Sequence, residues 1–470
     1  MATLIEQKPL LNLLPVGQDV IFSVSNSPIV SAHTRVKIVA DVYIDDSPIV
    51  IASSAPVGTF KTTPNNAGVG MFNFSPIIES FVKSDNSAYR QSKYKTTTAN
   101  DRPFSIHIVD KYSKNTDSVR YVAINFTTEY LDNDSSSPTF GNIILDTTSD
   151  VSGQLTVYNG YVKNTDSLLL QNSNFGFNAL PFILSTAQEG RFLTNAPDVQ
   201  YASKNDYGTL CVLADGDLEL STVRFTYTET DGTTSVEWIN RNWTNGAYTT
   251  ATSNSNSVFL YIGCFPANLR NWSGTFQALI AAGTLESYTV QCFNSSSQVL
   301  SEKITINLLC PNLKGYEPIR LTWLNQYGTW DYYTFTMKST KMISTKGSTY
   351  QQLGGSWNDS VYRIDGFKGG KKAFRVNAKE KVTMNTDFVS EAESEWFEEL
   401  INSPEVFILK GYDASEAAFS AGNINILLNT YVTPVRLTTS SYTKKTVAND
   451  KLMQYTFEVE KSKTLRTQSV

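Results

Sequence analysis

Histidine, the residue most often used for acid–base and nucleophilic catalysis, is almost absent from this sequence. The chain has two histidines, His33 and His107, and each lies in or beside a segment with the alternation of a strand. A Ser–His–Asp or Cys–His arrangement would have to be built on one of these two rings. The G-x-S-x-G, P-loop, G-x-G-x-x-G and H-E-x-x-H motifs are also missing. We therefore interpret both histidines as ordinary surface or packing residues.

Closely spaced carboxylates are the second group that could do chemistry, either in glycoside hydrolysis or in binding Ca²⁺. Glu391, Glu393 and Glu395 fall at the start of a predicted helix, where the helix dipole favours negative charge. The Asp pairs fall in sequences typical of turns. We predict no catalytic residue, no cofactor and no metal. The carboxylates considered are Asp132/Asp134, Asp215/Asp217, Glu391/Glu393/Glu395 and Glu398/Glu399.

The cysteines do not have the spacing of a zinc site. None of them forms a C-x-x-C pair, and all fall within one stretch of the chain. We interpret them as buried thiols, with one or two disulfides as the alternative. The four positions are Cys211, Cys264, Cys292 and Cys310.

The densest aromatic cluster lies between residues 319 and 337. This segment predicts a strand, a tight turn at Tyr327-Gly328 and a second strand. Because side chains alternate along a strand, Tyr333 and Phe335 are expected to face the core, and the opposite face could contact another subunit.

Polar residues of the same hairpin have an expected structural role. Asn325 and Asp331 are expected to satisfy backbone groups near the turn. The positions singled out as interface or motif residues are Trp323, Asn325, Tyr327, Gly328, Trp330, Asp331 and Tyr332.

The elements that must position these residues are mostly strands. Of the 470 residues, 12% are aromatic and only 18% are charged, and Ser, Thr and Asn supply much of the polar surface. This composition favours an all-β fold, mainly of antiparallel β-sandwich or immunoglobulin-like domains, with one or two short helices. A net charge of −5 lacks the electrostatic footprint of a nucleic-acid binder. No apolar run reaches the length of a membrane span, and the N-terminus has no signal-peptide pattern.

Four segments are expected along the chain. Strands in 1–150 predict a β-sandwich with a short helix near 75–82, in which Ser75 caps the helix and Pro76 begins it. Residues 151–198 are a connecting segment. Short strands divided by turns, including the hairpin signal Asp231-Gly232, predict an immunoglobulin-like sandwich over 199–315. Residues 316–470 form a C-terminal β domain with a helix near 391–402, which a capping box at Ser390 and Glu393 begins.

The aromatic hairpin carries a resemblance to a protein family. The sequence from Trp323 to Phe335 resembles a W-L-N-x-x-G-x-x-D-x-x-x-F signature of structural proteins from tailed bacteriophages that infect Bacteroidetes, including crAss-like phages. The segments 41–44, 64–82, 400–406 and 432–436 are similar to the N-terminal and closing domains of that group. The resemblance implies a tail or baseplate protein of the virion rather than a defined enzymatic activity.

The residues themselves favour the same class of function. Several sandwiches with few charges and many aromatics suit subunits that pack side by side. We expect a non-enzymatic structural protein that is made in the host cytoplasm and forms a ring or disc in the virion tail. Its expected partners are copies of itself, other tail or baseplate proteins and, at most, host surface glycans, with neither nucleic acid nor membrane insertion. The alternatives are a receptor- or carbohydrate-binding protein at the tail tip and, less favoured, a polysaccharide-degrading enzyme.

Overall fold

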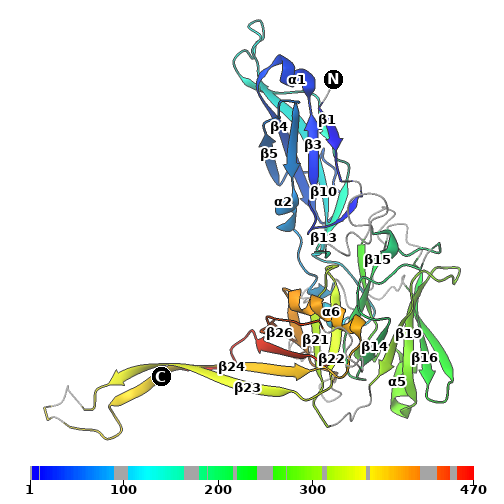
Figure 1. Ribbon diagram of the computed structural model, residues 1–470, viewed down its shortest axis with the longest axis vertical. Coiled ribbons are helices and arrows are strands. Elements are labelled where there is room, and N and C mark those ends of the chain that lie inside the picture. The colour runs from blue at the N-terminus through cyan, green and yellow to red at the C-terminus, as the bar shows by residue number, and fades with distance from the viewer. Residues whose placement is uncertain are drawn as a thin grey trace, which may run out of the picture. The chain divides into compact units, whose positions relative to one another are not determined.

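The structure is a computed structural model in which the chain divides into two compact units. Unit 1 comprises Met1–Gln200, Tyr207–Leu308 and Leu324–Asp331, and unit 2 comprises Tyr201–Asp206, Leu309–Trp323 and Tyr332–Val470. Strands dominate both units, so the expected all-β class is confirmed (Figure 1). The residues described are 3–9, 11–88, 104–163, 179–187, 189–214, 220–240, 258–270, 272–309, 315–355, 360–361, 363–412, 431–444 and 453–469.

Two sheets in the N-terminal part of unit 1 face each other across one core. The larger sheet has seven strands in the order β2-β13-β10-β4-β5, with β11 and β12 also paired to β10, and the smaller sheet has the order β1-β3-β6. Their bounds are β1 Leu4–Gln7, β2 Leu13–Pro15, β3 Ile21–Ser25, β4 Thr34–Asp45, β5 Gly58–Thr62, β6 Val69–Asn73, β10 Val119–Leu131, β11 Ile143–Leu145, β12 Asp150–Val151 and β13 Leu155–Tyr158.

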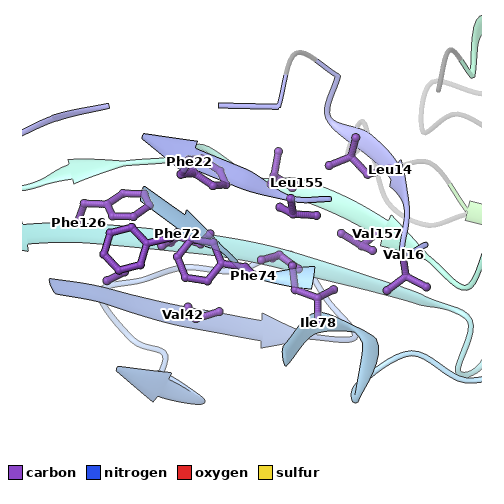
Figure 2. Packing of buried hydrophobic residues seen from close by; sticks show 14 of the residues in the cluster. Leu14, Val16, Phe22, Val42, Phe72, Phe74, Ile78, Phe126, Leu155 and Val157 are labelled. Carbon is purple, nitrogen blue, oxygen red and sulfur yellow. The ribbon is translucent and has the colours of Figure 1, made fainter. Parts of the chain in front are cut away.

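The core of this sandwich is built from side chains of both sheets. Side chains alternate along strand β4, so Ile38, Ala40 and Val42 share the face toward the core and are fully buried. Figure 2 shows Phe22 and Phe72 from the small sheet beside Phe126 from the large one. The ring centroids of Phe22 and Phe126 lie 5.4 Å apart, within the range of a favourable aromatic pair.

The short helix expected near 75–82 forms as α2 (Ser75–Glu79), but its cap differs from the expectation. The N-cap is Phe74, and no side chain caps the helix. The Ser75 hydroxyl instead donates to the carbonyl of Gln18 and accepts from the amide of Val20. Ser75 therefore ties the helix to the preceding chain, because its side chain reaches backbone groups that lie far from it in sequence.

The segment expected as an immunoglobulin-like sandwich supplies strands to two further sheets. Their orders are β14-β20-β19-β16-β17 and β15-β18-β9. The turn at Asp231-Gly232 joins β16 to β17 as predicted, with Gly232 at φ +85°. The bounds are β9 Tyr112–Lys114, β14 Val199–Ala202, β15 Thr209–Ala214, β16 Thr222–Glu229, β17 Thr234–Asn240, β18 Val258–Gly263, β19 Leu285–Phe293 and β20 Ile304–Leu308.

The strand pairings cross the domain boundaries expected from the sequence. Strand β13 lies beyond residue 150, yet it pairs with β10 inside the N-terminal sheet. Strand β9 belongs to the expected N-terminal domain, yet it pairs with β18. Strands pair by hydrogen bonding and need not be neighbours in sequence. The boundary expected at residue 150, where the composition resembles a linker, therefore does not coincide with the edges of these two sheets.

Helices are more numerous than the one or two expected. Helix α5 begins at the N-cap Ser273 and ends at Gly283, which has the left-handed conformation at φ +73°. The remaining short elements are α1 Ser27–Ala32, α4 Pro266–Leu269, α5 Gly274–Ala282, the 3-10 turns Ile106–Ile108 and Leu180–Phe182, and the pair β7 Ser87–Ala88 with β8 Phe104–Ser105.

Unit 2 is built on one eight-stranded sheet. Its order is β22-β21-β25-β26-β27-β24-β23, with β28 also paired to β24. Helix α6 (Glu391–Asn402) has the predicted bounds and the predicted capping box of Ser390 and Glu393. Its side chains Trp396, Phe397 and Leu400 are buried. The strands are β21 Ile319–Leu324, β22 Trp330–Phe335, β23 Thr340–Gln352, β24 Gly370–Asn385, β25 Val406–Leu409, β26 Val432–Leu437, β27 Thr456–Lys461 and β28 Arg466–Ser469.

The N-terminal core gives a direct test of this packing. We expect Phe126→Ala to lower the free energy of unfolding by about 3–5 kcal/mol, because it removes a fully buried ring and leaves a cavity. Phe140→Ala is the matched control, since Phe140 is 56% exposed, and it should change the stability by less than ~0.5 kcal/mol. Urea unfolding measures both variants, and equal losses would contradict the packing described.

Candidate assembly site

The aromatic hairpin singled out in the sequence has its turn in unit 1, where Asn325 organises it. The Asn325 side-chain oxygen accepts hydrogen bonds from the amides of Tyr327 and Thr329, at 3.0 and 3.1 Å. Its amide nitrogen donates to the carbonyl of Leu193 and to Asp331 Oδ1, at 2.9 and 3.0 Å. Asn325 therefore satisfies backbone groups of the turn as predicted, and it also fastens the turn to a distant segment.

Gly328 brings the turn against the backbone of Asn159. Its φ is +75°, and a Cβ added there would lie 1.8 Å from the Asn159 carbonyl oxygen. Both the left-handed conformation and the lack of space require glycine.

The other residues of the turn are also internal to unit 1. The Trp330 indole donates to the Asp85 carbonyl at 2.8 Å, and its ring meets the edge of His107 at a centroid distance of 4.8 Å. The Tyr327 hydroxyl donates to Asn195 at 2.9 Å. His107 is buried here as a packing residue, in agreement with the sequence interpretation.

The two remaining candidates lie inside unit 2. Trp323 is fully buried and packs against Trp396 of α6 at a centroid distance of 4.8 Å. The Tyr332 ring lies under the Arg320 guanidinium at 5.3 Å, and Arg320 is itself 3.5 Å from the Asp206 carboxylate.

Burial is the property that these candidates share. The six with side chains each expose 5% or less, and Gly328 is also buried. Such side chains have no surface left for a second molecule. The hairpin is therefore part of the interior of the chain, and an assembly surface has to be sought elsewhere.

Asp85 is a buried carboxylate that the sequence did not single out. It is fully buried, and its oxygens accept from the amides of Thr116, Asp117 and Ser118 and from the Tyr261 hydroxyl, at 2.7 to 3.0 Å. Nothing in its neighbours along the chain indicates this role. The donors explain how a buried carboxylate is tolerated, because each lone pair lost from water is replaced by a hydrogen bond.

Several of the carboxylates considered for chemistry are engaged in local structure. Asp132 accepts from the Asp134 amide and the Thr139 hydroxyl, and hydrogen bonds from Ser137 and Thr139 hold the pKa of Asp132 below its usual value. Glu393 belongs to the capping box of α6, and Glu398 pairs with Lys444. Asp215 and Asp217 lie outside the described residues. Within the described ranges, no group of three or more His, Cys, Asp or Glu side chains could hold a metal ion.

The largest exposed feature of unit 2 is a long hairpin formed by β23 and β24, here called the ribbon. Figure 1 shows it in yellow and orange, reaching away from the rest of the sheet of unit 2. Thirteen residues of β23 are paired with β24, from Thr340↔Thr383 to Gln352↔Gly370. Eleven of the thirteen are exposed, and Tyr350 and Gln352 are half-buried. Neither face of β23 is covered by the described residues.

One face of the ribbon is basic. Side chains alternate along a strand, and cross-strand partners share a face. Lys346 therefore lies on the same side as every second residue of β23 and as the β24 partners of those residues. The cations on this face are Lys346, Lys372, Arg375, Lys379 and Lys381.

On this face, the ion pairs seen among the described residues involve the cations near the base of the ribbon. Lys379 pairs with Glu460 at 2.7 Å, and Lys381 pairs with Glu458 at 2.8 Å. Lys346, Lys372 and Arg375 form no ion pair with a carboxylate of the described residues. We call these three residues the outer cations.

The described residues between β23 and β24 include strongly exposed apolar side chains. Phe367, Ile364 and Leu353 expose 76%, 74% and 67% of their surface, which are the three largest values among the exposed large hydrophobic side chains described. Exposed apolar groups that gather in one place are typical of binding surfaces. The ribbon thus combines an apolar end with basic outer cations.

Exposed aromatic side chains elsewhere lie on different elements. Examples are Phe60 in β5, Trp238 in β17 and Phe388 before α6. A sugar-binding platform would need several of these rings on one surface.

No family model matches this chain, and no curated protein matches it. Among the helices that the structure describes, none combines the length and the apolar character required to cross a bilayer.

The turn glycines provide a matched pair for testing the hairpin. Gly328→Ala should cost about 3 kcal/mol or more, because the methyl group strains φ and collides with the Asn159 carbonyl. Gly232→Ala has the same sign of φ but nothing within 4 Å, so it should cost only about 1–2 kcal/mol. Urea unfolding gives both values, and a smaller loss for Gly328→Ala than for Gly232→Ala would contradict the close approach.

The thiols allow a test by chemical labelling. Cys211 and Cys292 are free and buried, as predicted, Cys264 is also buried, and Cys310 lies outside the described residues. Burial raises the pKa of Cys292 to about 12 and that of Cys211 well above its usual value. The thiolate is the reactive form and is scarce far below the pKa, so iodoacetamide at pH 8 should leave these peptides unlabelled in the native protein. They should be labelled in guanidinium, and mass spectrometry reads each peptide; rapid native labelling of Cys292 would contradict its burial.

Proposed function

We propose that this chain is a non-enzymatic structural subunit of a bacteriophage virion that assembles into a ring or disc of the tail or baseplate. The observation that carries the proposal is the ribbon, an extension whose apolar and basic side chains are exposed among the described residues. Exposed apolar surface does not stabilise a monomer in water. It can stabilise an assembly, because contact with a neighbouring subunit removes it from water. The resemblance of the hairpin at 323–335 to virion proteins and the all-β sandwiches, with 199–315 interpreted as immunoglobulin-like, support the same class.

The geometry of the conspicuous sequence motif fits a structural role. The hairpin residues make internal hydrogen bonds and ring contacts, Asp132 accepts hydrogen bonds within a turn, and Glu393 caps helix α6. A subunit of a mechanical assembly needs this kind of rigid interior, because forces between subunits pass through the packed sheets.

Purification and imaging test the proposal. The recombinant chain should form closed rings in negative-stain images, with a sedimentation coefficient well above that of a 52.2 kDa monomer. Mass spectrometry of purified particles of the phage that encodes it should find the chain in the virion. Absence from the particle would contradict the proposal, as would an encoding genome that is not viral.

A further inference from the structure

We propose that the ribbon is the donor half of a head-to-tail interface and binds the acidic surface of a second copy of this chain. The inference rests on the proposed function, and it adds the segment that joins one subunit to the next. The partner is identified by charge, reach and the shape of the ribbon.

Charge is distributed unevenly within the chain. Strands β23 and β24 hold seven Lys or Arg and one Glu, a net +6. Because the whole chain has a formal charge of −5, the residues outside these two strands carry a net −11. A basic extension and an acidic remainder attract each other between copies.

The same distribution disfavours polyanionic partners. Nucleic acid or an anionic membrane would meet three outer cations on the ribbon and would then be repelled by the acidic remainder of the chain. A second copy is not repelled in this way, because its residues outside the ribbon carry a net negative charge that attracts the basic ribbon. The net charge of −5, which by itself argues against a nucleic-acid partner, is thus an average that includes a local basic surface on the ribbon. That local surface does not change the expectation that nucleic acid is not the partner.

The ribbon is long enough to reach a neighbour. Thirteen strand residues span roughly 44 Å at about 3.4 Å per residue. Two-stranded sheets are only marginally stable in water, and β23 is an edge strand of its sheet, with β28 flanking β24 along only four residues. Contact with a second copy would cover the basic face and the apolar connection together.

A donor on one surface and an acceptor on another make a heterologous interface. Such an interface closes into a ring when the rotation between copies closes, and otherwise grows into a filament. The proposed ring therefore follows from one kind of contact, used once by each subunit.

Charge reversal at the outer cations tests the inference. The variant Lys346→Glu/Lys372→Glu/Arg375→Glu changes side chains at the surface of the ribbon, so the fold should be retained, which thermal unfolding checks. We expect its self-association to weaken at least tenfold in sedimentation velocity. The charge-conserving variant Lys346→Arg/Lys372→Arg/Arg375→Lys should assemble like the wild type. Added NaCl should weaken wild-type assembly, because it screens the attraction.

A second reversal elsewhere controls for total charge. Lys37→Glu/Lys83→Glu/Lys303→Glu makes the same change at exposed lysines outside the ribbon and should leave assembly unchanged. The ribbon variant keeps its acceptor surface, so an excess of it mixed with wild-type chain should cap growing assemblies and yield small species in place of rings.

The outcomes separate this inference from the proposed function. Wild-type rings together with rings of the ribbon variant would overturn the inference and leave the function standing. Equal loss in both reversed variants would assign the effect to net charge and overturn it too. A wild-type monomer that is absent from virions would overturn both. Binding of labelled duplex DNA or anionic vesicles that only the ribbon variant loses, without a change in assembly, would assign the ribbon to that other partner instead.

Discussion

A sheet of two strands has no interior, and this constraint governs the most unusual part of the molecule. Along β23 and the outer part of β24, both faces meet water unless another molecule covers them. The sheet of unit 2 supports the ribbon only at its base, where Val382 and Met384 are buried and Lys381 pairs with Glu458. Beyond the base, the ribbon is held by the pairing of β23 with β24 and of β24 with the short strand β28, together with a ring contact between Tyr350 and Phe374.

The interior of the chain shows the opposite use of polar groups. Asn325 and Asp85 are buried, and each makes several hydrogen bonds to backbone and side-chain donors or acceptors. A buried polar group that loses its partner costs more than the bond contributes. These networks therefore favour one arrangement of the loops within unit 1.

The conspicuous motif and the proposed contact surface turned out to be different parts of the chain. The aromatic hairpin attracts attention because large rings cluster there, yet clustering of rings is also what a packed core requires. Trp323 illustrates this point, since it is fully buried against Trp396. The ribbon, in contrast, is rich in Lys, Ser, Thr and Gln, and its composition resembles that of a loop.

The sequence by itself determined the elements whose signals are local. The capping box of α6 and the turn at Asp231-Gly232 each depend on residues within a few positions of one another, and both form as predicted. Only the tertiary structure decided the pairings of β9 with β18 and of β13 with β10, the burial of Asp85 and the extent of the ribbon. The physical reason is that strand pairing and burial depend on partners distant in sequence, and a strand with water on both faces has no apolar alternation that a sequence pattern could reveal.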